Sequence, residues 1–226
     1  MTTDRPHDLE PTDEELLAEI DAELAAEAAG RRRAPERVTG AVLLLGGAVS
    51  WVAALVLMID KLFLLENPGA QLGCDINPFI SCGDVMSTWQ AATFGIPNMA
   101  IGLAGYAIMA CIGSLLLSGA RLPRWFSWAT LGGMTFAFGF IQFLAISAIF
   151  VIKALCPWCM LVWLMTAPMF FAVLARTIES GTWRAPAPLA VVLRHWVVLS
   201  IAWYALVVLA ILGGFWRQWL YMVGLG

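Results

Sequence analysis

Five long apolar runs follow one another along the chain after residue 37, and short polar or charged intervals separate them. The first, from Val38 to Ile59, contains no charged residue and exceeds the roughly 20 residues that a helix needs to cross a bilayer. Pro168, inside the fourth run, predicts a kink at which a neighbouring helix must bond the freed backbone carbonyl. We predict an all-α integral membrane protein whose residues 38–226 form a five-span membrane domain. The predicted spans cover residues 38–59, 97–118, 125–152, 156–175 and 196–216.

The first 37 residues differ in composition, because they hold more than half of the charged residues of the chain, most of them acidic. Thr12 and Glu15 fit a capping box, and an alanine-rich stretch follows them. This pattern predicts a short amphipathic helix over residues 13–29, within an acidic cytoplasmic tail of residues 1–37. The same acidity and the scarcity of large apolar residues are also typical of a solvated, partly disordered tail. We predict no chemistry in this segment.

Arginine residues before the first span and in every second loop set the predicted orientation, because short loops rich in arginine and lysine remain in the cytoplasm. The N-terminus is therefore predicted inside and the C-terminus outside, with the loop of residues 62–96 and the turn of residues 153–156 on the extracytoplasmic side. A net charge of −3 gives no indication of a nucleic-acid partner. These arginines lie at positions 31–33, 37, 121, 124, 176, 184 and 194, whereas Lys61, Lys153 and Arg217 fall on the predicted outer side.

Four of the five cysteines fall on the extracytoplasmic side, where disulfides persist. The fifth, Cys111, lies inside the second span and is interpreted as a small apolar packing residue. Cys156 and Cys159 are separated by two residues at the start of the fourth span. A thiolate on a first helical turn faces unpaired backbone N–H groups that stabilise its charge, so this spacing is typical of a redox pair.

Two dithiols on one side of a membrane suggest a relay, in which thiol–disulfide exchange moves two electrons through a mixed disulfide. Cys74 and Cys82 lie in a loop that can meet a protein thiol, whereas the second pair lies at the membrane boundary, where a quinone can accept electrons.

Two alternative roles of these four cysteines stay open here. The cysteines could form two structural disulfides, although a two-residue spacing makes a poor staple. They could also ligate zinc, although the gap between Cys74 and Cys82 exceeds the usual spacing of paired zinc ligands.

Three motifs in order resemble the vitamin K epoxide reductase family, and most of all its bacterial members. They run from Cys74 to Cys82, from Phe94 to Asn98 at the start of the second span, and from Cys156 to Cys159. The resemblance covers about residues 40–176. It implies a four-helix transmembrane bundle around a quinone site, in the bacterial inner membrane. The fifth transmembrane helix is predicted from its apolar run alone and lies outside the resemblance. The quinone would be menaquinone or ubiquinone, and no metal is implied.

The resemblance also assigns roles to the motif residues. Cys159 would attack the quinone, and Cys156 would be its partner and exchange with Cys82. Cys74 would meet the external thiol. Asn98 would donate a hydrogen bond to a quinone oxygen, as in an oxyanion hole, although an asparagine at this position could also be a polar cap at a helix start.

The sequence departs from the family pattern at Trp163, where vertebrate members carry a tyrosine that bonds the quinone. An indole N–H can also donate, but with a different reach, so Trp163 is only a candidate quinone-binding residue. Asp75 and Ser87 are candidates for supporting the cysteine-bearing loop. No histidine lies near the predicted site, so the protons for quinol formation are expected from thiols, Asp75 or water.

We predict a membrane thiol–quinone oxidoreductase that passes electrons from an exported thioredoxin-fold, DsbA-like protein through both cysteine pairs to a quinone, driving disulfide formation. Some family members carry a fused thioredoxin-like domain, and this sequence ends ten residues after the fifth span, so the partner is expected to be a separate protein. One alternative makes the reduced quinone or epoxide the main product. Another is a non-catalytic scaffold with structural disulfides. A transporter would need ionisable residues inside the spans, which are almost free of them.

Overall fold

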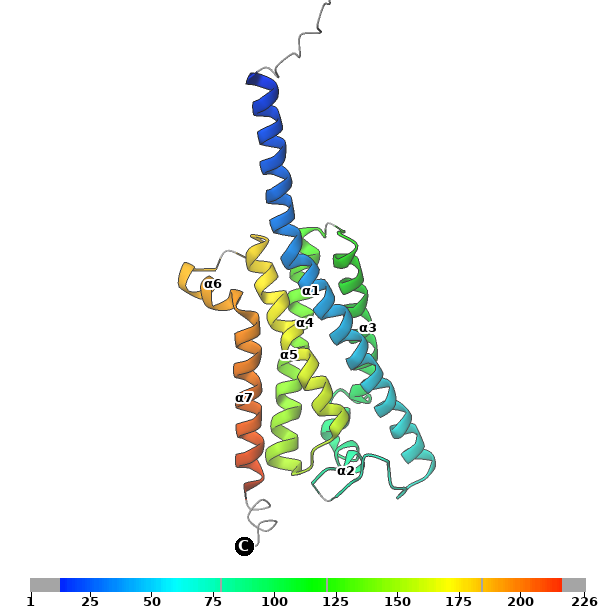
Figure 1. Cartoon of the computed structure of the whole chain (residues 1–226). Coiled ribbons are helices and arrows are strands. Elements are labelled where there is room, and N and C mark those ends of the chain that lie inside the picture. Colours follow the sequence, from blue (N-terminus) through cyan, green and yellow to red (C-terminus); the bar gives the residue numbers. More distant parts are fainter. Residues whose placement is uncertain (1–12, 78, 121, 184, 217–226) are drawn as a thin grey trace, which may run out of the picture.

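The computed structural model describes residues 13–77, 79–120, 122–183 and 185–216, which fold into helices joined by short loops (Figure 1). Apart from isolated backbone bridges, this part of the chain contains no β-structure. The predicted all-α class is confirmed. In chain order the elements are α1 (Asp13–Glu66), α2 (Cys82–Met86), η1 (Trp89–Ala92), α3 (Asn98–Leu117), α4 (Arg124–Ile146), η2 (Ser147–Ile152), α5 (Pro157–Glu179), α6 (Ala187–Arg194) and α7 (Trp196–Gly214).

Five helical segments are long and apolar enough to cross a membrane, which confirms the predicted multi-pass membrane fold. Segments from α1, α3, α4 and α5 form a bundle, and α7 packs beside it against α5 (Figure 1). The third segment joins α4 to η2, a wider π-helical turn. The five segments are Glu36–Glu66, Asn98–Leu117, Arg124–Ile152, Pro157–Glu179 and Trp196–Gly214.

The first helix differs from the prediction. α1 is one helix of 54 residues, whereas the sequence indicated a short helix over residues 13–29 that ends before the first span. The helix continues through Gly30 and Pro35, and its N-terminal part projects well beyond the bundle (Figure 1). Alanine, glutamate and arginine are strong helix formers, so propagation from the membrane span outweighs the combined cost of one glycine and one proline. The expected helix is therefore the first part of α1, and residues 1–12 of the predicted tail lie outside the described residues.

Glycines allow α1 and α3 to pack closely. A Cβ atom at Gly47 would lie 2.8 Å from the backbone nitrogen of Ala110, and one at Gly113 would collide with the backbone of Leu44. Small residues at such interfaces let helix backbones approach in a membrane, where no hydrophobic effect drives helices together. α1 also packs against α5, and α5 against α4, whereas α3 and α4 make few direct contacts. This arrangement leaves space between α3 and α4.

The fifth helix satisfies a carbonyl that the proline in α5 leaves free. Pro168 has no N–H to bond the carbonyl of Leu164, four residues earlier in the helix. The hydroxyl of Tyr204 on α7 donates to that carbonyl at 2.6 Å. The prediction that a neighbouring helix would bond the freed group is confirmed, because an unpaired carbonyl is costly in hydrocarbon. α7 is thus attached to the bundle by a specific hydrogen bond.

α6 was not predicted, since the segment between the fourth and fifth spans was interpreted only as an arginine-bearing loop. Its first turn contains a proline and its last turn contains Arg194, which are ordinary signals of a helix start and end. Its eight residues are too few to stand out as an apolar run. α6 lies at the end of the bundle from which α1 projects, opposite the end that carries α2 (Figure 1).

Candidate functional site

A disulfide joins Cys74, in the loop of residues 67–81 (the Cys loop), to Cys82 at the start of α2, with an S–S distance of 2.03 Å. Cys74 is half-buried, whereas Cys82 is completely buried. Ser81 caps α2, because its hydroxyl accepts a hydrogen bond from the N–H of Asp84 at 3.1 Å. This disulfide, the outer pair, therefore presents one sulfur toward the surface and the other toward the protein interior.

The carboxylate of Asp75 organises the chain around the outer pair. It accepts hydrogen bonds from the N–H of Leu72 at 2.9 Å, and from the hydroxyl of Ser81 and the N–H of Gly83, each at 3.0 Å. Partial burial raises the pKa of Asp75, but these hydrogen bonds outweigh it, so the pKa lies below the usual range of an aspartate. Asp75 is therefore ionised at neutral pH and holds the Cys loop against the start of α2.

A short backbone bridge joins the Cys loop to the turn before α5. The N–H of Leu155 donates to the carbonyl of Phe79 at 2.8 Å, and the N–H of Ser81 donates to the carbonyl of Leu155 at 3.1 Å. Because Ser81 and Leu155 each precede a cysteine, the bridge brings Cys82 and Cys156 together. Their sulfurs lie 3.3 Å apart, and their side chains are 0% and 1% exposed. The two sulfurs are thus in contact and shielded from water.

Cys156 and Cys159, the inner pair, are free thiols at the start of α5. Cys156 is the N-cap, and Pro157 begins the helix, where its missing N–H costs no hydrogen bond. Cys159 lies one turn into the helix and is half-buried. The structure therefore contains an oxidised outer pair in contact with a reduced inner pair.

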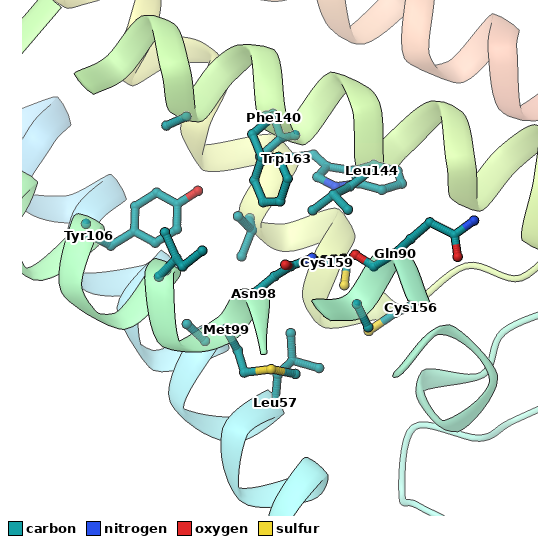
Figure 2. Close-up of a pocket in the computed structure, with 18 of the residues that line it drawn as sticks. Leu57, Gln90, Asn98, Met99, Tyr106, Phe140, Leu144, Cys156, Cys159 and Trp163 are labelled. Carbon is teal, nitrogen blue, oxygen red and sulfur yellow. Dashed lines mark hydrogen bonds between the residues drawn. The ribbon is translucent and has the colours of Figure 1, made fainter. Parts of the chain in front are cut away.

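A cavity of about 430 Å³ adjoins the inner pair, enclosed by α1, the loop around η1, α3, α4 and α5 (Figure 2). Both inner cysteines line it, and most of the other lining residues are apolar. Ile108 and Phe136, which also line the cavity, are exposed on the outer surface of the bundle, where α3 and α4 are apart. The volume and lining suit an apolar ligand with a few polar groups that arrives from the surrounding lipid.

Asn98 and Trp163, the two residues predicted to meet a quinone, both line this cavity. The amide of Asn98 donates to the carbonyl of Gln90 at 2.5 Å and accepts from the N–H of Thr93 at 3.2 Å. Asn98 therefore ties α3 to the preceding loop, and its second amide N–H is available for a ligand. Figure 2 shows Asn98 close to Cys159 in the view.

Tyr106 and Gln90 are cavity residues that the sequence analysis did not identify. The hydroxyl of Thr166 donates to the carbonyl of Val162, so the hydroxyl of Tyr106 donates to Thr166, over 2.8 Å. Tyr106 follows Asn98 by about two helical turns and so shares its face of α3, a spacing that could have identified it. Gln90 gives no comparable signal, because it lies in η1, a helical turn too short to show a periodic pattern.

Two further residues lie elsewhere than expected. Ser87, a candidate for loop support, is exposed at the end of α2 and donates to the carbonyl of Asp84 at 2.8 Å, away from the cavity. Lys61 holds this end of α2 instead, since its ammonium donates to the carbonyl of Met86 at 2.9 Å. Cys111, expected to be a packing residue, is exposed on α3. A small apolar side chain can also face lipid, so its position in an apolar run does not establish burial.

Neither alternative arrangement of the cysteines matches this geometry. In the described residues, no group of three or more histidine, cysteine, aspartate or glutamate side chains could hold a metal ion. Two structural staples would need both pairs to be closed, whereas the inner pair consists of thiols.

Residues 41–174, more than half of the chain, match the model of the vitamin K epoxide reductase family. The chain belongs to the vitamin K epoxide reductase family. A search of curated proteins found no significant match. As a vitamin K epoxide reductase family member, the chain is a membrane oxidoreductase of the thiol–quinone type. The matched range contains both cysteine pairs and the cavity, whereas α6, α7 and the projecting part of α1 lie outside it.

Proposed function

We propose that this protein passes two electrons from an exported dithiol protein through the outer pair and then the inner pair to a membrane quinone, and so drives disulfide formation. The observation that carries the proposal is the 3.3 Å separation of the Cys82 and Cys156 sulfurs, at the junction of an oxidised and a reduced pair. Contact between a thiol and a disulfide sulfur is the prerequisite for exchange.

Electrons enter at Cys74, the more exposed sulfur of the outer pair. A thiolate of the partner attacks Cys74, so a mixed disulfide forms and Cys82 leaves as a thiolate. The second partner thiol then attacks the partner's own sulfur in that mixed disulfide. The partner leaves with a new disulfide, and Cys74 leaves as a thiolate, so the outer pair has gained two electrons.

The outer pair then reduces an inner pair that is in its disulfide form. The Cys82 thiolate attacks Cys156, so the Cys82–Cys156 bond forms and Cys159 leaves as a thiolate. Attack of Cys74 on Cys82 closes the outer disulfide and releases Cys156. The pairing in the structure, outer oxidised and inner reduced, corresponds to the product of this step.

The cavity supports a quinone as the final acceptor. Its walls are apolar, it reaches the lipid-facing surface, and the free N–H of Asn98 is a hydrogen-bond donor for a ligand. When the inner dithiol closes to a Cys156–Cys159 disulfide, it gives up two electrons and two protons, which would reduce a bound quinone to the quinol. Cys159 supplies the thiolate that faces the cavity, and Asn98 would donate to the oxygen that gains negative charge. Both menaquinone and ubiquinone meet these requirements.

The partner class follows from the exposed sulfur. A separate thioredoxin-fold, DsbA-like protein carries a reactive cysteine at its surface, which can reach Cys74 but not the buried Cys82. We place the protein in the bacterial inner membrane with the N-terminus in the cytoplasm and the outer pair outside, because the arginines alternate in that sense. The bacterial periplasm, the compartment outside this membrane, is kept oxidising by quinone-linked systems.

The proposal is tested by anaerobic quinone reduction, followed by ultraviolet absorbance, on detergent-purified protein that receives a reduced thioredoxin-fold substrate. We expect Cys159→Ser and Cys74→Ser to abolish the reaction, and the matched control Cys111→Ser to leave it unchanged. If Cys74→Ser still accepts electrons from a small dithiol, the outer pair is the protein-facing shuttle.

Two outcomes would overturn the proposal. If the native chain reduces no quinone and its inner pair is permanently oxidised, the stapled-scaffold alternative holds. If a deletion strain keeps normal disulfides in its exported proteins but loses quinol, the product that matters is the reduced quinone.

A further inference from the structure

We propose that the end of α7 is a clamp for sulfur exchange, in which Phe215 and Lys153 hold the Cys loop and the turn before Cys156 in register. The clamp is a positioning device for the relay proposed above, and its relevance to electron transfer rests on that relay. α7 and Phe215 lie outside the residues matched to the family, whereas Lys153 lies inside them, so the clamp joins an added helix to the matched core.

Phe215 provides the first half of the clamp. It directly follows α7, is 3% exposed, and packs edge-on against Phe79, with 6.4 Å between ring centroids and an interplanar angle of 87°. The carbonyl of Phe79 accepts the hydrogen bond from Leu155 that forms one side of the backbone bridge. Phe215 and Leu155 belong to the same buried cluster. One aromatic ring thus contacts the Cys loop on the residue that pairs with the turn before Cys156.

Lys153 provides the second half of the clamp, from the turn between η2 and Cys156. Its ammonium donates to the carbonyl of Gly214, in the last turn of α7, at 3.0 Å. A cation at this position satisfies a carbonyl that has no partner within the helix and interacts favourably with the negative end of the helix dipole. Lys153 has a left-handed backbone with φ of 60°, and this turn leads the chain from η2 toward Cys156. The turn is therefore fastened to α7 two residues before Leu155.

Close packing leaves little room for α7 to shift. A Cβ atom at Gly214 would collide with the side chain of Ile149 in η2. The hydroxyl of Tyr204 holds the same helix to α5 farther along, through the carbonyl of Leu164. α7 is thus attached to α5 near its middle, and Phe215 at its end packs in the same cluster as Phe79 and Leu155, which form the bridge.

The clamp matters most when the outer disulfide is open. During turnover the bond between Cys74 and Cys82 is broken, and that covalent link across the loop is lost. The backbone bridge, the bonds to Asp75 and the contact with Phe215 then hold Cys82 toward Cys156. A displacement of about 1 Å between reacting groups can cost on the order of a hundredfold in rate. The clamp keeps the two sulfurs in contact through that stage.

The test isolates the exchange between the two sulfurs. The full chain with Cys111→Ser and Cys159→Ser keeps the outer disulfide and one thiol, Cys156. Attack of the Cys156 thiolate on Cys82 forms the Cys82–Cys156 crosslink, and Cys74 leaves as a thiolate, so no dissolved oxidant has to reach the buried sulfurs. A maleimide-linked polymer in detergent traps the released Cys74, the more exposed sulfur, and the gel shift of the trapped chains gives the rate of the crosslink.

We expect Phe215→Ala and Lys153→Met to slow this crosslink by on the order of tenfold or more. Lys153→Arg, which keeps a cationic donor, restores the rate. Trp216→Ala is the matched control at the neighbouring position, because Trp216 is 62% exposed, and it leaves the rate unchanged. Crosslinking of Phe215→Ala and Lys153→Met at the native rate would overturn the proposal.

A substitution at a second buried site tests whether the effect comes from positioning of the sulfurs or only from loss of stability. Met169→Ala opens a cavity in a core cluster remote from the cysteines, where Met169 is 0% exposed. We expect it to lower the thermal unfolding midpoint at least as much as Phe215→Ala while the crosslink forms at the native rate. Equal slowing by Met169→Ala would assign the effect to general stability and overturn the clamp. The assay needs neither quinone nor partner, so failure of the proposed function and failure of the clamp give different results.

Discussion

Single side chains in this protein often act in two places at once. The amide of Asn98 bonds the loop before α3 and still has an N–H for the cavity. The carboxylate of Asp75 joins three donors on both sides of the outer pair. Sequence reasoning identified both residues from the motifs that contain them, but it missed Tyr106, whose partner Thr166 lies on another helix. Contacts between helices cannot be seen in a pattern along one chain.

Tyr106→Phe tests whether this hydroxyl acts only within the bundle. Its one proton is donated to Thr166, so we expect the KM for quinone to stay unchanged and the protein to be destabilised by about 1 kcal/mol. Steady-state quinone reduction and unfolding in detergent measure the two effects. Thr166→Val is the matched variant, since it removes the other partner of the same hydrogen bond. A higher KM in Tyr106→Phe would mean that the hydroxyl meets the acceptor instead.

Asp75→Asn tests the electrostatic support of the Cys loop. Because the pKa of Asp75 is lower in the folded protein than in the unfolded chain, its ionised form contributes stability above about pH 4. That contribution is lost as pH falls through the lowered pKa. We expect the native unfolding midpoint to fall on acidification through this range, and Asp75→Asn to weaken that dependence while lowering stability at neutral pH. Parallel acid profiles for the two proteins would contradict this role.

At the scale of elements, the apolar runs predict the spans well, because about 20 consecutive apolar residues have few alternatives to a membrane helix. The continuous α1 was harder to predict, since Gly30 and Pro35 are ordinary signals for a helix end. The bridge between Ile80 and Leu155 could not be predicted, because it pairs segments far apart in the sequence. The two-residue spacing of the inner pair indicated redox chemistry, whereas its contact with Cys82 came from the family resemblance and depends on that bridge.

The link between α5 and α7 gives a prediction at this scale. Tyr204→Phe is expected to destabilise the protein by about 1–3 kcal/mol, because it leaves the carbonyl of Leu164 unpaired. In a Pro168→Ala background the new N–H bonds that carbonyl within α5, so the same substitution should cost much less. Unfolding in mixed detergent micelles measures all four proteins. An equal loss in both backgrounds would show that the tyrosine does not act through this carbonyl.

At the scale of the whole molecule, the Cys loop and the projecting part of α1 lie at opposite ends of the bundle (Figure 1). Orientation therefore decides which compartment supplies the thiols. The arginine pattern predicts an outward Cys loop, but a helical bundle has the same internal contacts in either direction. Only the distribution of charge relative to the membrane makes one direction favourable.

Labelling of intact cells checks this orientation. In a chain whose native cysteines are replaced by serine, Ser87→Cys at the end of α2 is expected to react with a membrane-impermeant maleimide. Ser118→Cys, exposed after α3, is expected to react only after the membrane is opened. The reverse pattern would contradict the predicted direction.

The burial of Cys82 and Cys156 insulates the two sulfurs from redox-active molecules in solution. Both sulfurs at the crossing between the pairs are at most 1% exposed, so dissolved oxidants and small reductants have almost no access to them. In the proposed relay, electrons enter at Cys74 and leave at the cavity beside Cys159. Burial of the two sulfurs therefore limits the loss of electrons to oxygen or unrelated thiols, and it favours transfer from the partner protein to the quinone.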